Sequence, residues 1–191
     1  MIPDSNNETI KIKLPADFKI KRYGVECRLV TEDDSAFILS LRIDKSLSRF
    51  LHSTENNEMK QREWIREYKK RESEGKDYYF IYSINGEAFG VNRIYDINQD
   101  KCTGGSWICK PGTATEYVVA SSLINRDIMF EFLNLKEDNF EVRKGNDKVK
   151  KFHKMMGCIK TGENELETLF RSTPDTYFPK RDKMLNLLNI K

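Results

Sequence analysis

Hydrophobic and polar positions change their period within residues 140–159. Phe140 and Val142 alternate with charged neighbours, and this period of two predicts a short strand. The apolar residues that follow recur at the three- and four-residue spacing of a helix, with lysines on the other faces. The apolar helical positions are Val149, Phe152, Met155 and Met156.

Polar and small residues mark both ends of this helix. Asn146 is predicted as the N-cap, its side-chain oxygen accepting a free backbone N–H, and Gly157 as the C-terminal stop. A second strand is expected to begin at Cys158. The unit therefore reads as strand, capped helix, glycine and strand. His153 lies one turn before the helix ends, beside the apolar stripe rather than opposite it.

The same periodicities predict elements along most of the chain. Strands are expected at 25–30, 77–84, 87–97, 103–109 and 166–170, and helices at about 35–43, 61–68 and 116–133. Asn85-Gly86 between two apolar-aromatic runs predicts a hairpin. The predicted organisation is a polar extension over 1–22, with an alternating run at 10–14 that would add an edge strand, one domain over 23–173, and a helical tail over 174–191 packed on that domain.

Composition narrows the class of protein only a little. The 191 residues suffice for one domain, and 33 basic against 30 acidic residues leave a net charge of +3. This small excess argues weakly for nucleic acid and suits anionic small ligands equally. No apolar run is long enough for a membrane span. We therefore expect neither a nucleic-acid nor a membrane partner.

Cysteine and histidine usage points to a reducing compartment without a metal site. Four scattered cysteines form no CxxC pair, and only two histidines are present. Such thiols are typical of the cytoplasm and pack as small hydrophobic residues. We therefore expect a cytoplasmic protein that holds no metal.

The stretch 140–159 resembles the C-terminal half of the GNAT (GCN5-related) N-acetyltransferase superfamily. The matching residues are Val142, Asn146, Val149, Phe152, His153 and Gly157. The resemblance extends in element order over about 23–172. It implies a mixed α/β (α+β) fold whose central, mainly antiparallel sheet of six to seven strands is flanked by helices. The sheet is expected to splay between the strands at 103–109 and 140–143, so that acetyl-CoA enters there.

The resemblance also implies where the cofactor binds. The strand ending at Cys109 is expected to pair with the pantetheine arm, and the loop that opens the next helix to cradle the pyrophosphate through backbone N–H groups. That loop carries one glycine, Gly112, where the family usually has two. The implied cofactor-binding residues are Trp107, Ile108, Cys109, Lys110, Gly112, Thr113, Thr115, Asn146, Lys148 and Phe152. Plainer alternatives stay open: a core tryptophan, a simple helix cap and a solvated lysine face.

Acetyl transfer to an amine needs a base for the amine and a proton for the departing thiolate. Many family members use a Tyr as the proton donor at the position of His153, and imidazole can serve as acid or base. The alternative is a histidine packed at the domain surface. Asp96 is a candidate base on its strand, and His52 falls in the loop expected to line the acceptor pocket, although local hydrogen bonding would also explain it. The base is otherwise unassigned.

The first two helices suggest the class of acceptor. The pattern Leu-Arg, Arg-Phe-Leu, then Gln-x-x-Trp-Ile resembles members that acetylate amino groups on nucleotide-linked sugars. The expected substrate-binding residues are Arg42, Arg49, His52, Arg93 and Tyr95. Two alternatives remain: acetylation of a peptide or protein N-terminus, and a non-catalytic acyl-CoA-binding domain. A homodimer is compatible with either reading.

Overall fold

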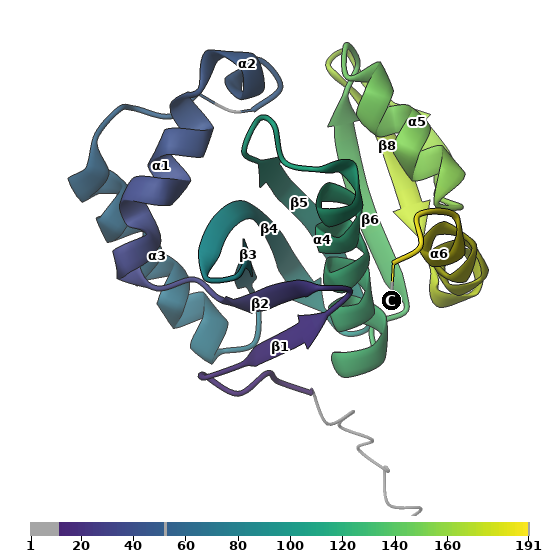
Figure 1. Ribbon diagram of the computed structural model, residues 1–191, viewed down its shortest axis with the longest axis horizontal. Helices are drawn as coiled ribbons and strands as arrows, with labels where there is room; N and C mark the ends of the chain where they lie inside the picture. The colour runs from purple at the N-terminus through teal and green to yellow at the C-terminus, as the bar shows by residue number, and fades with distance from the viewer. Residues whose placement is uncertain (1–11, 52, 191) are drawn as a thin grey trace, which may run out of the picture.

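An open sheet runs through the molecule in the order β1-β2-β3-β4-β5-β6-β8-β7 (Figure 1). The computed structural model describes residues 12–51 and 53–190. Within them the strands are β1 (Lys19–Arg22), β2 (Val25–Leu29), β3 (Tyr78–Ile84), β4 (Glu87–Asn98), β5 (Lys101–Cys109), β6 (Glu137–Arg143), β7 (Ile159–Glu163) and β8 (Glu167–Ser172). All neighbours pair antiparallel except β5 and β6, which are parallel. The predicted mixed, mainly antiparallel sheet is confirmed.

Helices cover both faces of the sheet. They are α1 (Ser35–Ile43), α2 (Lys45–Ser48), α3 (Glu58–Ser73), α4 (Thr115–Asp127), α5 (Asp147–Met155) and α6 (Pro174–Leu187), with a 3-10 turn at Glu32–Asp34 and a π-helical turn at Ile128–Phe132. In Figure 1, α1, α2 and α3 lie on one side of the molecule and α4, α5 and α6 on the other. None of the helices in the described part of the chain is long and apolar enough to cross a membrane.

Alternation along β3 explains how one sheet carries two cores. Tyr78, Phe80 and Tyr82 pack with residues of α4 and α6, whereas Tyr79 and Ile81 pack with α1 and α3. Successive side chains of a strand point to opposite faces, so an uninterrupted apolar run buries both. Helices therefore pack on both faces of the sheet at β3. The sheet is continuous except where β5 and β6 separate.

The observed sheet has one strand more than the six to seven expected. The additional strand is β1, which pairs with β2 at the edge. The sequence placed an edge strand at 10–14, but residues 12–14 form no strand, and residues 10 and 11 lie outside the described residues. The sequence thus predicted that a strand is added at this edge of the sheet, but not which residues form it.

The helix α5 and its N-cap differ from the predicted pattern at Met155, His153 and Asn146. Met155 is 52% exposed and His153 is buried, whereas Met156 is buried as predicted. The buried face consequently runs through His153, one residue away from the predicted stripe. Asn146 occupies the N-cap position, but its side chain makes no capping hydrogen bond and instead lines a cleft described below. The side chain is left available for a ligand.

A buried carboxylate attaches the C-terminal helix α6 to α4. Asp127 on α4 accepts hydrogen bonds from the hydroxyl of Tyr177 at 2.9 Å, from Nη1 of Arg181 at 3.1 Å and from the hydroxyl of Tyr23 at 2.7 Å. Nη1 of Arg22 lies 3.2 Å from the same carboxylate. One fully buried anion therefore joins α6 to α4 and to the β1–β2 turn.

Replacing Gly157 by Ala is expected to lower the free energy of unfolding by about 3 kcal/mol. Its φ is +81°, and an added Cβ would overlap the carbonyl oxygen of Thr176 on α6. Gly86→Ala is the matched control, because Gly86 has a φ of +83° with no atom near its Cβ position, so only the backbone cost of about 1 kcal/mol remains. Urea unfolding measures both variants, and equal losses would contradict the proposed overlap.

Asp127→Asn is expected to destabilise the protein by about 3 kcal/mol, because two arginines lose their buried anion. Amide hydrogen exchange in α6 should accelerate more than exchange in β3. Asp182→Asn serves as control, since Asp182 pairs with Nε of Arg181 at 3.0 Å but is exposed, and surface pairs contribute little. Unchanged protection of α6 in Asp127→Asn would refute this attachment.

Candidate active site

A cleft of about 420 Å³ opens where β5 and β6 separate. The two strands pair only at Lys101 with Glu137 and at Cys102 with Asp138. Beyond these two pairs, β5 pairs with β4 and β6 pairs with β8. The edges of β5 and β6 that face each other are therefore available to an extended ligand. The expected opening between the strands at 103–109 and 140–143 is present.

A β-bulge bends β5 beside this opening. Ser106 has a φ of +53°, and the register with β4 shifts between Val91 and Arg93. A bulge adds a residue to one strand and increases its local bend and twist. Both Ser106 and Trp107 line the cleft. The bulge thus lies on the part of β5 that no longer pairs with β6.

The closed end of the cleft contains a buried ion pair. Nη2 of Arg126 on α4 lies 3.5 Å from Oδ2 of Asp138, which belongs to the last β5–β6 pair. Oδ1 of Asp138 accepts the backbone N–H of Gly104 at 2.8 Å. A Cβ at Gly104 would crowd this contact, since it would lie 2.9 Å from Cε of Met129 and 3.0 Å from Oδ1 of Asp138. The Nε atom of Arg126 is buried without a partner in the described structure.

His153 stands next to this pair, and its Nδ1 lies 3.2 Å from Nη2 of Arg126. The imidazole is only 6% exposed yet lines the cleft. Its ring contacts several others, with centroid distances of 4.6 Å to Phe140, 6.0 Å to Trp107 and 5.4 Å to Phe152. Burial, together with the neighbouring guanidinium, lowers the pKa of His153 well below its ordinary value. The histidine is therefore neutral in the folded protein.

Trp107 connects β5 to both helices on its side of the sheet. Its Nε1 donates to the hydroxyl of Ser121 on α4 at 3.0 Å, and its ring lies 5.3 Å from that of Phe152 on α5. The indole thus lies at the opening where the backbone of β6 separates from that of β5. Trp107 is at once a packed residue and a wall of the cleft.

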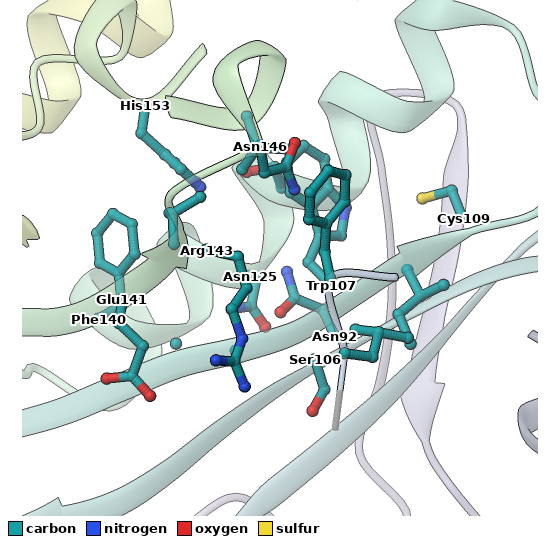
Figure 2. Close-up of a pocket in the computed structure, with 18 of the residues that line it drawn as sticks. Asn92, Ser106, Trp107, Cys109, Asn125, Phe140, Glu141, Arg143, Asn146 and His153 are labelled. Carbon is teal, nitrogen blue, oxygen red and sulfur yellow. The ribbon is translucent and has the colours of Figure 1, made fainter. Parts of the chain in front are cut away.

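The other face of the cleft is more polar. In Figure 2, Glu141, Arg143 and Ser106 point away from His153 and Asn146. Tyr95 on β4 also lines this face. Burial, followed by the nearby carboxylate of Glu141, raises the pKa of Tyr95 to about 12, so the phenol keeps its proton. Further lining comes from the α1–α2 region, namely Arg42, Ser46, Leu47, Phe50 and Leu51.

The loop from β5 to α4 follows Cys109, the last residue of β5 that lines the cleft, and leads to the start of a helix. Gly112 has a φ of +84°, and both the backbone N–H and the hydroxyl of Thr113 bond to the carbonyl of Lys110, at 3.2 and 2.7 Å. The N-cap of α4, Ala114, supplies no side-chain cap. The N–H of Tyr117 bonds to the carbonyl of Ala114 at 3.1 Å, which leaves the N–H groups of Thr115 and Glu116 for an anion. A free strand edge leading to an uncapped helix start fits an elongated ligand that ends in phosphates.

The structure brings together part of the predicted site. Those predicted residues that line the cleft are Arg42, Tyr95, Trp107, Ile108, Cys109, Asn146, Lys148 and His153. Phe152 supports Trp107 from α5. Lys110, Gly112, Thr113 and Thr115 lie beyond the lining of this cleft, in the loop and first turn that follow Cys109. His52 lies outside the described residues, so its suggested roles stay predictions.

Three predicted residues lie elsewhere. Nε of Arg93 donates to Asp77 at 2.7 Å beneath the ring of Trp64, because pairing of β3 with β4 sets Arg93 beside α3. Asp96 has a φ of +51° and is exposed at an irregularity of β4. Arg49 is exposed, with its guanidinium 4.5 Å from the ring of Phe50. None of the three lines the cleft, so the structure gives them no place in it.

Several cleft residues were not anticipated from the sequence. They are Asn92, Asn125, Arg126, Asp138, Glu141 and Arg143. One pattern could have indicated Arg126, since Asn125, Arg126 and Asp127 interrupt the apolar face of a helix that the chain buries on all sides. A charged residue at such a position needs a buried partner. The partner, Asp138, becomes visible only in three dimensions.

Neither a scan of family models nor a search of curated proteins gives a match. Solved structures do match. FdhC in its apo form, described as a nucleotide-linked sugar GNAT, is 32% identical, with coverage of 88% of this chain and 97% of that chain and a TM-score of 0.80.

Two more distant structures share the fold alone. Ribosomal-protein-S5-alanine acetyltransferase from Vibrio fischeri is 15% identical, with 85% and 100% coverage and a TM-score of 0.73. Mycobacterium smegmatis RimJ in complex with CoA-disulfide is 15% identical, with 94% and 93% coverage and a TM-score of 0.73. The 32% identity to FdhC over 88% of this chain shows that the chain belongs to the GNAT family of acetyltransferases.

Proposed function

We propose that this protein transfers the acetyl group of acetyl-CoA to a primary amine on a nucleotide-linked sugar. The observation that carries the proposal is the β5–β6 cleft, in a chain 32% identical to FdhC, a nucleotide-linked sugar GNAT. The cofactor would lie along the free edge of β5, with its phosphates at the first turn of α4. A homodimer and a cytoplasmic location stay predictions.

Acetyl-CoA supplies an acetyl thioester, and attack by a neutral amine breaks its carbon–sulfur bond and leaves a thiolate. The residues that would hold the cofactor are Trp107, Cys109, Thr113, Thr115, Asn146 and Lys148. His153 lines the cleft beside the buried pair of Arg126 and Asp138, and its imidazole can offer an N–H donor. We assign it to the side of the departing sulfur, where a hydrogen-bond donor stabilises developing negative charge.

The polar face would receive the acceptor. Arg42 and Arg143 both line it, and guanidinium groups match phosphate oxygens bidentately. Phe50 and Tyr95 add aromatic surface for a base or a sugar ring. An anionic, partly aromatic acceptor such as a nucleotide-linked sugar satisfies both features.

Binding of coenzyme A should change the fluorescence of Trp107. The protein has two tryptophans, and Trp64 lies on α3 against Tyr68 and Tyr79, so Trp64→Phe leaves Trp107 as the only reporter. A saturable change in emission is expected on titration with coenzyme A. Trp107→Phe should show no such change while still binding by calorimetry. A flat titration of Trp64→Phe under conditions where calorimetry detects binding would contradict placement beside Trp107.

Acetyl-CoA with a panel of amino-sugar nucleotides should release free thiol, measured with a chromogenic disulfide. His153→Ala is expected to lower kcat about 100-fold through loss of one donor. Lys154→Ala, which changes the exposed neighbouring residue, should leave kcat unchanged. Peptide amines in the same assay separate the alternative acceptors. Thiol release with peptides and none with any sugar nucleotide would reject the proposed acceptor.

A further inference from the structure

We propose that Arg126 holds His153 in a single neutral tautomer, with its proton on Nε2, and that His153 acts in the cleft as a hydrogen-bond donor rather than as an imidazolium acid. The tautomer follows from the geometry of the described residues. The part that concerns catalysis rests on the proposed transferase function. Arg126 is in this account a positioning residue.

The assignment of the proton follows from the valence of the two groups. Nη2 of Arg126 lies 3.2 Å from Nδ1 of His153. A guanidinium has five N–H donors and no acceptor, so the nitrogen that faces it must offer a lone pair. Nδ1 is consequently unprotonated, and a neutral imidazole carries its one proton on Nε2.

The guanidinium is itself fixed from several sides. Nη1 of Arg126 donates to the hydroxyl of Ser122 at 3.3 Å, and Nη2 lies 3.5 Å from Oδ2 of Asp138. Its Cζ lies 5.3 Å from the ring centroid of Phe140, and the whole side chain is 5% exposed. Arg126 is therefore held away from solvent, with Nη2 pointing at the imidazole.

Among the described residues, no carboxylate is hydrogen-bonded to the imidazole to stabilise a second positive charge. Asp138, the carboxylate nearest to Arg126, is already bonded to the N–H of Gly104. The two thiols near Arg126, Cys102 and Cys158, and the phenol of Tyr177 are neutral, since burial raises the pKa of each. The aromatic residues Trp107, Phe140, Phe152 and Phe170 complete the surroundings. Protonation of Nδ1 would set two cations against each other in a desolvated site.

This arrangement limits what His153 can do chemically. Its Nδ1 is occupied, so it takes no proton from the amine, and a neutral imidazole is too weak an acid to give up the Nε2 proton outright. Nε2–H can still donate a hydrogen bond to the oxygen or sulfur on which charge develops. The proton that the sulfur finally gains then comes from the nitrogen that has attacked, which becomes cationic as the carbon–nitrogen bond forms, or from water.

Two histidines in the whole chain make the tautomer directly observable. In ¹⁵N-labelled protein, long-range ¹H–¹⁵N correlations distinguish a protonated ring nitrogen from an unprotonated one, and His52→Gln assigns the remaining signals to His153. We expect a protonated Nε2, an unprotonated Nδ1 and shifts that stay constant from pH 8 to pH 5. A protonated Nδ1, or a transition near the ordinary pKa of about 6.5 in folded protein, would overturn the proposal.

Variants of Arg126 separate positioning from simple packing. Arg126→Gln keeps an N–H donor without the charge, so the Nε2–H tautomer should persist while the pKa of His153 rises toward its ordinary value. The pair Arg126→Leu with Asp138→Asn removes donor and counter-ion together and should release the tautomer. If Arg126 had a packing role only, neither the tautomer nor the pKa of His153 would change in these variants. If either variant fails to fold, the spectrum of the unmodified protein decides the question.

Kinetics test the catalytic half separately. Gln at position 153 carries an amide N–H near the place of Nε2, so His153→Gln should keep kcat within about tenfold of the unmodified protein, against a loss of about 100-fold for His153→Ala. The pH profile of kcat should show the same ionisations in the unmodified protein and in His153→Gln, because His153 itself does not ionise. Equal losses in both variants would refute the donor role. Absence of turnover with every amine would refute the transferase proposal and leave the tautomer result standing.

Discussion

Two residue pairs are the whole of the ladder between β5 and β6, and the function of the fold depends on that shortness. A parallel pair that continued for five or six residues would fill the space with backbone hydrogen bonds. Here the bulge at Ser106 bends β5, while β6 turns to pair with β8 along its length. Unpaired backbone groups stay available to a ligand, and the opening is made by strand geometry rather than by a moving lid.

The point of separation carries the buried charges of the site. Asp138 belongs to the last β5–β6 pair, and its carboxylate reaches back to Gly104 and across to Arg126. A buried ion pair costs desolvation and stabilises a fold only when its hydrogen bonds are well made. This pair lies between the sheet, α4 and α5, where it sets the position of a guanidinium that in turn orients His153.

A second buried carboxylate, Asp127, follows Arg126 directly and has a different structural role. Asp127 faces the opposite way along α4 and collects donors from the β1–β2 turn and from α6. The consecutive charges of α4 thus divide their roles, one toward the cleft and the other toward the chain termini. Displacement of α6 would consequently disturb α4, the helix that also carries Arg126.

The sequence by itself determined the local structure, because periodicity, Asn-Gly turns and helix-ending glycines act over a few residues. It predicted α1 at its observed bounds, the β3–β4 hairpin, the order of elements and the place of His153 on α5. Only the tertiary structure decided which side chains share the cleft. Pairing of β3 with β4 drew Arg93 to Asp77, and the separation of β5 from β6 joined Arg126, Asp138 and His153. These contacts join residues 12 to 27 positions apart in the chain, and strand register and helix packing, which no local pattern encodes, set them.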